Sequence, residues 1–346
     1  MPRTSRQLCL RSRPDNQLKT SDLIIAETPI PTLGPDEVLV RNSWLSIDPS
    51  TRIRLAEATP RGYLPPLELG DPLTGLALGI VVDSNSADFE PGDLVSHMYG
   101  FRDFAVVGAG GATMGGYGSL TKVDPGGFPP QWFLGPLGSS GLTAYAGLVG
   151  VLEIDRDDVV WVSAAAGAVG SIASQLAKLR GCTVIGSAGS PAKVEYLTER
   201  LGLDAAFDYH DGAIAALLAT AAPNGISAYF DNVGSGHLAA AIDNLGQAGR
   251  VAMCGSIADY DASDSPSPGP SNLFQLISKE IRIQGFRAGS YMHMADEMRA
   301  EVGSYLSDGR MVHSELVFDG LESAPAALIA MLGGENTGKT LCRIDS

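Results

Sequence analysis

A glycine-bearing turn near the middle of the chain has the residue types and spacing of a phosphate-binding site. Residues 164–170 read Ala-Ala-Ala-Gly-Ala-Val-Gly and join a short apolar run to a segment with helical spacing. Gly167 would let the backbone approach a pyrophosphate, which the amino end of the following helix stabilises. Gly170 would let that helix pack close to the strand. The pattern also fits a tight strand–helix turn without a ligand, because Ala164 stands at its first position.

The residues about twenty positions further on indicate which dinucleotide this turn binds. NAD-binding proteins place an acidic residue there, which binds the ribose diol. Residues 186–190 here are Gly-Ser-Ala-Gly-Ser, without a carboxylate, and Lys193 follows. A hydroxyl and an ammonium group suit a 2′-phosphate, which a carboxylate would repel. The pattern predicts NADPH as the cofactor, although Lys193 also fits an ordinary solvated helix position.

The sequence lacks the residue patterns that zinc-dependent catalysis and serine hydrolysis require. Catalytic zinc needs three neighbouring His, Cys or carboxylate ligands, but the histidines are far apart and the cysteines show no CxxC spacing. No serine occupies a nucleophile-elbow motif. Scattered cysteines are typical of reduced thiols, so we expect a metal-free cytoplasmic protein. The residues concerned are His97, His210, His237, His293 and His313, and Cys9, Cys182, Cys254 and Cys342.

The elements around the turn alternate between strand and helix. Apolar runs predict strands at 158–164, 183–188, 205–208, 227–231, 250–255 and 281–286, and helical spacing predicts helices at 168–180 and 191–201. Ser190 can cap the second helix and Gly202 can end it. This alternation predicts an α/β fold with a doubly wound parallel sheet. Residues 258–272, rich in Asp, Ser and Pro, are expected to form an exposed loop.

The first third of the chain has a different pattern. Short apolar runs at 23–25, 37–40, 78–83 and 94–97 are divided by turns such as Pro-Gly-Asp at 91–93. This pattern predicts a rolled-up antiparallel domain. A chain of 346 residues exceeds the size of one core, so two domains are expected.

Composition excludes several classes of partner. Apolar residues make up 45% and charged residues 18% of the chain, as in a soluble globular protein. A net charge of −15 argues against nucleic acid as a partner. No apolar run is long enough to span a membrane, and residues 1–16 lack the hydrophobic core of a signal peptide.

Taken together, the motifs resemble those of the zinc-free branch of the medium-chain dehydrogenase/reductase superfamily, which includes prostaglandin reductases and 2-alkenal double-bond reductases. The resemblance extends from about residue 35 to residue 341. It implies a Rossmann domain at 131–315 and a β-rich, GroES-like substrate domain at 1–130 and 316–346, with the active site in the cleft between them. The matching stretches are residues 45–49, 141–145, 164–170, 229–234, 254–260 and 335–339.

The resemblance also implies a role for individual residues. The pyrophosphate would lie on Gly167, Ala168, Val169 and Gly170, and the 2′-phosphate end would meet Lys193 and Tyr209. Asn232 would face the cofactor at a strand end, and Asn336 would reach it from the carboxyl-terminal segment. The nicotinamide half would lie against Cys254, Ser256, Tyr260, Phe286, Arg287 and Ala288. Tyr209 and Phe286 also fit core aromatics, and Cys254 also fits a small buried apolar residue.

For the substrate, the resemblance indicates Tyr63, Met98, Tyr99 and Tyr260. The sequence departs from the family pattern at Ser50 and Thr51, where an aromatic residue and Met usually follow Asp48-Pro49. Losing the aromatic side chain should enlarge or rewet the pocket, so the substrate's identity cannot be carried over. Ser139 and Ser140 also replace the usual Met-Pro pair.

The expected reaction is NADPH-dependent reduction of the carbon–carbon double bond of an α,β-unsaturated ketone or aldehyde. Hydride would reach the β carbon, and Tyr260 would stabilise the enolate oxygen. Two alternatives use the same cofactor site: a quinone reductase and a non-catalytic NADPH-binding regulatory protein. The resemblance further implies a homodimer, with the strand at 281–286 at a sheet edge and paired across a two-fold axis.

Overall fold

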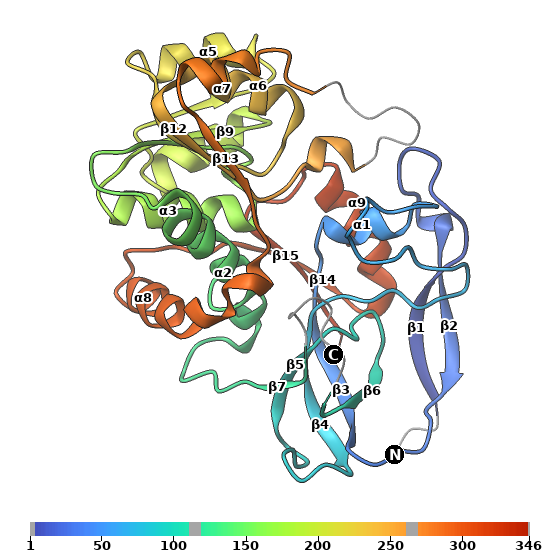
Figure 1. Ribbon diagram of the computed structural model, residues 1–346. Coiled ribbons are helices and arrows are strands. Elements are labelled where there is room, and N and C mark those ends of the chain that lie inside the picture. Colours follow the sequence, from blue (N-terminus) through green and yellow to red (C-terminus); the bar gives the residue numbers. More distant parts are fainter. Residues whose placement is uncertain (1–3, 111–118, 261–268, 345–346) are drawn as a thin grey trace. The chain divides into compact units, whose positions relative to one another are not determined.

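The short apolar runs of the sequence become strands of two separate sheets. The structure, a computed structural model, describes residues 4–110, 119–260 and 269–344 (Figure 1). The first unit comprises Met1–Leu134, Glu315–Asn336 and Thr340–Ser346, and the second comprises Gly135–Ser314 and Thr337–Lys339. These limits differ from the expected domain limits by a few residues, and they assign Thr337–Lys339 to the second unit.

The second unit contains a parallel sheet. Within the described residues its order is β10-β9-β8-β11-β12-β13, and the strand pairs are parallel. In chain order this is the 3-2-1-4-5-6 arrangement of a Rossmann fold, which confirms the predicted fold class. β13 lies at the edge, as predicted. The strands are β8 (Val159–Val162), β9 (Thr183–Ala188), β10 (Ala205–Asp208), β11 (Ile226–Asp231), β12 (Leu245–Met253) and β13 (Arg282–Gly285).

Helices cover this sheet in two groups. In Figure 1, α5, α6 and α7 lie together, and α2, α3 and α8 form a second group. The apolar core against β8 and β11 includes the fully buried Trp161 and Tyr229, whose rings stack 4.3 Å apart. The helices are α2 (Ser139–Tyr145), α3 (Ala168–Leu179), α4 (Pro191–Glu195), α5 (Ile214–Ala221), α6 (Ser235–Asn244), α7 (Phe274–Ser278) and α8 (Ala295–Ser307), with the irregular helices η3 (Ala146–Leu152), η4 (Tyr196–Arg200), η5 (Ile257–Asp259) and η6 (Ala288–Met294).

Several predicted limits in this unit were wrong. The helix expected at 191–201 begins as predicted, with the Ser190 hydroxyl accepting the Lys193 N–H, but it widens into the π-helical turn η4 after Glu195. β12 begins five residues before Arg250 and ends at Met253, because the next two N–H groups bond to the Asp231 carbonyl instead of continuing the ladder. β8 ends at Val162 because the turn begins there.

The loop expected at 258–272 is only partly described. Its start belongs to η5 (Ile257–Asp259) and its end continues into α7, whereas residues 261–268 lie outside the described residues.

The first unit is built mainly from antiparallel strands, as predicted. In its described part, one sheet runs β14-β15-β3-β4-β5-β7, with β6 also paired to β3, and β1 and β2 form a separate antiparallel pair. Helix α9 packs its apolar face into the same core as β1. The elements are β1 (Thr4–Leu10), η1 (Thr20–Asp22), β2 (Leu23–Pro29), β3 (Glu37–Ser46), α1 (Ser50–Arg54), β4 (Ala77–Ser84), β5 (Leu94–His97), β6 (Phe104–Gly108), β7 (Thr121–Lys122), η2 (Pro130–Leu134), β14 (Glu315–Asp319), η7 (Leu321–Ser323), α9 (Ala324–Leu332) and β15 (Lys339–Arg343).

A search of the described residues for a helix with the length and hydropathy of a membrane span finds none.

Candidate active site

The glycine-bearing turn connects the central strand β8 to α3. Ala164 adopts a left-handed conformation (φ 47°), and its carbonyl accepts the Gly167 N–H at 2.9 Å. A Cβ on Gly170 would lie 2.3 Å from the Ala164 carbonyl oxygen. The backbone of the turn at Ala164 and Ala165 therefore leaves no room for a side chain at Gly170. The first N–H groups of α3 lack helical acceptors, as at any helix amino end, and they lie beside the switch point between β8 and β11.

The carboxyl-terminal segment lies against this turn. The Gly338 N–H donates to the Ala166 carbonyl at 2.8 Å, and Gly338 pairs with Gly167 as an isolated bridge. Gly338 has a φ of +75°, and a Cβ there would lie 1.9 Å from the Ser314 carbonyl oxygen. Only glycine fits this position. Asn336, which is half-buried, precedes this contact by two residues.

The residues predicted for the 2′-phosphate end lie around the turn after β9. Lys193 is on α4, and Tyr209 directly follows β10. The Tyr209 hydroxyl lies so close to Gly189 that a Cβ on this glycine would approach it to 2.7 Å. Lys193 lies three residues beyond Ser190, half-buried, and burial lowers its pKa. A half-buried ammonium group is stabilised by an anionic partner. The structure therefore brings Tyr209 onto this turn, which has no carboxylate of its own.

A buried polar network lies under the ends of β8 and β11. The Tyr229 hydroxyl bonds to the Ser163 hydroxyl at 2.9 Å and to the Asp231 carboxylate at 2.8 Å. The same carboxylate oxygen accepts the N–H groups of Val233 and Gly234 at 2.9 and 2.7 Å. Burial raises the pKa of Asp231. The network fixes the turn that carries Asn232.

Asn232 links the two strand ends. Its side-chain amide donates to the Ser163 carbonyl at 2.7 Å, and its backbone N–H donates to the Ser163 hydroxyl at 3.0 Å. It thus lies at the carboxyl end of β11, beside the glycine-bearing turn. Ser163, Tyr229 and Asp231 were not predicted as site residues, although the motif at 229–234 contains two of them.

The segment after β12 lies alongside this turn. The N–H of Cys254 donates to the Asp231 carbonyl at 2.8 Å, and burial raises the pKa of the Cys254 thiol to about 12. Such a thiol is protonated and unreactive at neutral pH. Further along, the Ser256 N–H donates to the Tyr260 hydroxyl oxygen at 3.4 Å. The Tyr260 hydroxyl therefore lies over the turn at the end of β12.

Phe286, Arg287 and Ala288 continue from β13 at the same edge of the sheet. The Phe286 N–H donates to the Met253 carbonyl at 3.3 Å, and its ring meets the Phe230 ring edge-on at 6.2 Å. A Cβ on Gly147 would lie 2.8 Å from the Phe286 ring. The Phe286 ring therefore packs against Phe230 and Gly147.

The residues predicted for the substrate belong to the first unit, apart from Tyr260. Met98 and Tyr99 directly follow β5, and Gly75 pairs with Tyr99 and donates its N–H to the Met98 carbonyl at 3.0 Å. Tyr63 is hydrogen-bonded to the Ser50 side chain, and burial raises its pKa. The departure at Ser50 therefore replaces an aromatic ring with a hydroxyl that binds Tyr63.

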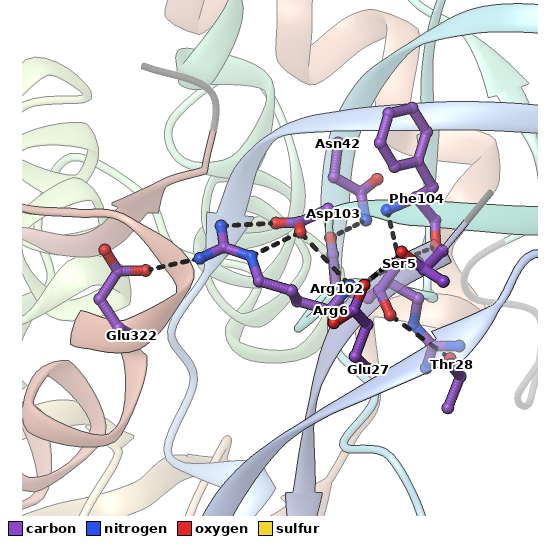
Figure 2. A network of polar contacts seen from close by, with 10 residues as sticks. Ser5, Arg6, Glu27, Thr28, Asn42, Arg102, Asp103, Phe104 and Glu322 are labelled. Carbon is purple, nitrogen blue, oxygen red and sulfur yellow. Dashed lines mark hydrogen bonds and ion pairs between the residues drawn. The ribbon is translucent and has the colours of Figure 1, made fainter. Parts of the chain in front are cut away.

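Polar contacts hold the loop after β5 in place. The Asn42 amide donates to the carbonyls of Tyr99 and Arg102 at 3.1 and 2.8 Å. Arg6 on β1 pairs with Asp103 at 2.8 Å, and Figure 2 shows this pair beside Asn42 and Arg102. The loop that presents Met98 and Tyr99 is therefore anchored from two strands.

Comparison with known proteins agrees with this geometry. The chain matches two family models, described as the N-terminal domain of oxidoreductase (residues 6–114) and zinc-binding dehydrogenase (residues 168–303). It is 34% identical to the NADPH-dependent curcumin reductase of Escherichia coli (strain K12), over 98% of this chain and 97% of that one. It is 35% identical to the NADP(+)-dependent 2-alkenal reductase of Nicotiana tabacum, over 99% and 98% of the two chains.

A solved structure shows the same fold. The crystal structure of CurA from Vibrio vulnificus in complex with NADPH has a TM-score of 0.90 with this chain at 33% identity, covering 99% of each chain. Among the residues described here, no cluster of three His, Cys, Asp or Glu side chains could hold a metal ion.

The Rossmann sheet, the glycine-bearing turn and the strand-end residues define a dinucleotide-dependent oxidoreductase. More narrowly, the chain belongs to the zinc-free branch of the medium-chain dehydrogenase/reductase superfamily, together with the prostaglandin and 2-alkenal reductases.

Proposed function

We propose that this protein is an NADPH-dependent reductase of the carbon–carbon double bond of α,β-unsaturated ketones and aldehydes. Bound NADPH supplies a hydride, which adds to the β carbon of the substrate. The protein has to orient the double bond, exclude water and stabilise the negative charge that develops on the carbonyl oxygen. The α carbon then takes a proton from Tyr260 or from water.

One observation carries the assignment of Tyr260. Its hydroxyl oxygen lies 3.4 Å from the Ser256 nitrogen, at the carboxyl end of β12. In sheets of this type, ligands bind outside the carboxyl ends of the strands. A phenol there can donate a hydrogen bond to an enolate oxygen while its own oxygen accepts one from the backbone. Together with a ribose hydroxyl of the cofactor, Tyr260 stabilises the oxygen as its charge grows.

The fit of the cofactor rests on the strand-end geometry. The pyrophosphate lies at Gly167, Ala168, Val169 and Gly170, where a Cβ on Gly170 would displace the backbone. The 2′-phosphate end would meet Lys193 on α4 and Tyr209 after β10, beside the Gly189–Ser190 turn, which has no carboxylate of its own. The nicotinamide half would lie along Asn232, Cys254, Ser256, Phe286, Arg287 and Ala288, and Asn336 would reach the cofactor from the carboxyl-terminal segment. Buried Asp231 and Tyr229 hold this edge rigid.

The substrate is held by Tyr63, Met98, Tyr99 and Tyr260 in this proposal. Because Ser50 binds the Tyr63 hydroxyl, the pocket is more polar here than one with an aromatic residue at this position. We expect it to accept enones with oxygen-bearing substituents.

The test of this function is Tyr260→Phe. We expect kcat with an enone to fall about ten- to a thousandfold, the range for loss of one oxyanion donor when other donors partly substitute. NADPH affinity should stay unchanged, because the phosphates are bound elsewhere. Tyr305→Phe, which alters a phenol bonded to Glu301 on α8, is the matched control. An unaltered kcat in Tyr260→Phe, with only a modest change in KM, would show that Tyr260 merely shapes the pocket.

We also propose that the protein is a homodimer formed through β13. This strand lies at the sheet edge, and the nearby helix α7 exposes Phe274 and Ile277 to 76% and 73%. Unpaired edges and exposed apolar side chains are liabilities unless another chain covers them. Light scattering at assay concentration should give twice the chain mass, and a monomeric mass would refute the proposal.

The cytoplasm is the proposed location. All four cysteines are free thiols, as expected of a protein from a reducing compartment. Fractionation of the source cells with a cytoplasmic marker enzyme tests this placement.

A further inference from the structure

The segment that carries Tyr260 is bound along the turn after β11. The N–H groups of Cys254 and Gly255 donate to the Asp231 carbonyl at 2.8 and 3.1 Å. Further along, the Ile257 N–H donates to the Asn232 carbonyl at 3.3 Å. The Ala258 N–H donates to the Val233 carbonyl and the Tyr260 N–H to the Ile257 carbonyl, both at 3.3 Å. Backbone bonds therefore run along the segment as far as Tyr260, but they do not fix its phenol.

A side-chain contact between Ser256 and Asp259 adds to these backbone bonds. The Ser256 hydroxyl donates to the Asp259 carboxylate, and the Asp259 N–H donates back to the Ser256 carbonyl at 2.9 Å. Ser256 is also the residue whose N–H meets the Tyr260 hydroxyl. The Asp259 side chain therefore holds the residue that anchors the phenol.

The opposite side of Ser256 is confined by Gly234. A Cβ on Gly234 would lie 2.5 Å from the Ser256 hydroxyl oxygen, and Gly234 has a φ of +76°. Ser256 is thus enclosed between Gly234 on one side and Asp259 on the other. With Asp259 removed, the Ser256 hydroxyl would lose its acceptor and η5 would lose the side-chain contact that links its two ends.

We propose that Asp259 is a positioning residue for Tyr260, acting through the hydroxyl and the N–H of Ser256. This inference rests on the proposed role of Tyr260 and extends it to the residue directly before Tyr260 in the chain. The bond from Ser256 to the phenol is long, at 3.4 Å, so it holds the ring only if the turn itself is rigid. Displacing an oxyanion donor by about 1 Å can cost up to a hundredfold in rate.

The experiment compares Asp259→Ala with Asp259→Asn. The alanine variant removes the acceptor, whereas the asparagine carbonyl can still accept the Ser256 hydroxyl. We expect Asp259→Ala to lower kcat with an enone about tenfold, and Asp259→Asn to restore kcat to within about twofold of the wild type. Asp308→Ala, which removes an exposed carboxylate beyond α8, is the control and should match the wild type.

Two further measurements separate positioning from a general structural effect. In the Tyr260→Phe background, Asp259→Ala should leave kcat unchanged, because the group that it positions is gone. Hydrogen exchange of the peptide spanning residues 254–260 should be faster in Asp259→Ala than in Asp259→Asn. An equal loss of kcat in both backgrounds, or wild-type exchange in Asp259→Ala, would overturn the inference.

If Tyr260→Phe alone keeps a wild-type kcat, the proposed function of Tyr260 fails, and the exchange measurement still decides whether Asp259 positions the phenol.

Discussion

The choice between NADPH and NADH depends on single residues at the end of β9. Lys193 is half-buried and carries a pKa lowered by burial, so its charge is poorly solvated before a ligand binds. A 2′-phosphate would place a strong negative charge beside this ammonium group. Lys193→Ala should therefore weaken NADPH binding by about 1.5–3 kcal/mol, the scale of a charged hydrogen bond, and leave NADH binding unchanged.

Titration with both cofactors measures this effect. Lys122→Ala is a suitable control, because Lys122 is an exposed lysine in the first unit that pairs with Asp93. Equal losses for NADPH and NADH in Lys193→Ala would contradict the assignment of Lys193 to the 2′-phosphate.

Residue types and local spacing were enough to predict two features of the proposed cofactor site. The turn at 164–170 and the missing carboxylate after β9 could be recognised because each lies within a few consecutive residues. The contact between Tyr229 and Ser163 could not be recognised in this way, since these residues are 66 positions apart and meet only because β8 pairs with β11. Gly338 and Ala166 meet for a similar reason, at the return of the carboxyl-terminal segment.

At the scale of elements, the approach of α3 to the turn after β8 depends on Gly170. A Cβ at this position would lie 2.3 Å from a backbone oxygen, so the helix or the turn would have to move. Gly170→Ala should lower the free energy of unfolding by roughly 1–3 kcal/mol, the usual cost of overpacking, and should weaken NADPH binding.

Gly236 on α6 provides the matched comparison. A Cβ there would meet no atom within 4 Å, and alanine favours a helix more than glycine does. Gly236→Ala should therefore leave the stability unchanged or raise it by up to about 1 kcal/mol. Urea unfolding of both variants measures the difference, and equal stabilities would contradict the close approach at Gly170.

The elements that the sequence predicted well are those whose limits are set locally. β9 and β10 have the predicted limits, because each is a short apolar run that ends at a turn. The start of β12 was missed because Ala248 (φ 57°) and Gly249 interrupt the pattern of an extended strand. β1 was missed because its amino-terminal half is polar, and Leu8 and Leu10 are buried by residues distant in the sequence, on β2 and α9.

At the scale of the whole molecule, two buried histidines make folding sensitive to acid. Burial lowers the pKa of His97 to about 3 and that of His237 to about 4. Both are therefore neutral in the folded protein at pH 5, whereas in the unfolded chain they bind protons near pH 6.5. Their contribution to stability is fully present above pH 6.5 and is lost as the pH falls towards the folded-state values.

The free energy of unfolding should therefore fall between pH 7 and pH 4.5, by up to about 2–3 kcal/mol for each histidine. Asp231, whose pKa is raised, opposes part of this loss, because it binds its proton earlier in the folded state. His237→Phe, which can still stack on Trp161, should reduce the dependence on pH. Urea unfolding at the two pH values tests this, and an identical pH dependence in His237→Phe would rule out the contribution of His237.

The central claim, reduction of a conjugated double bond, can be tested by following the transferred hydrogen. The enzyme is incubated with NADPH deuterated at C4 of the nicotinamide and with a straight-chain enone, and the product is analysed by NMR and mass spectrometry. We expect a saturated ketone that carries deuterium on its β carbon and a solvent proton on its α carbon. An allylic alcohol with deuterium on the carbonyl carbon would contradict the proposed reaction. Oxidation of NADPH by a quinone but not by any enone would contradict it as well.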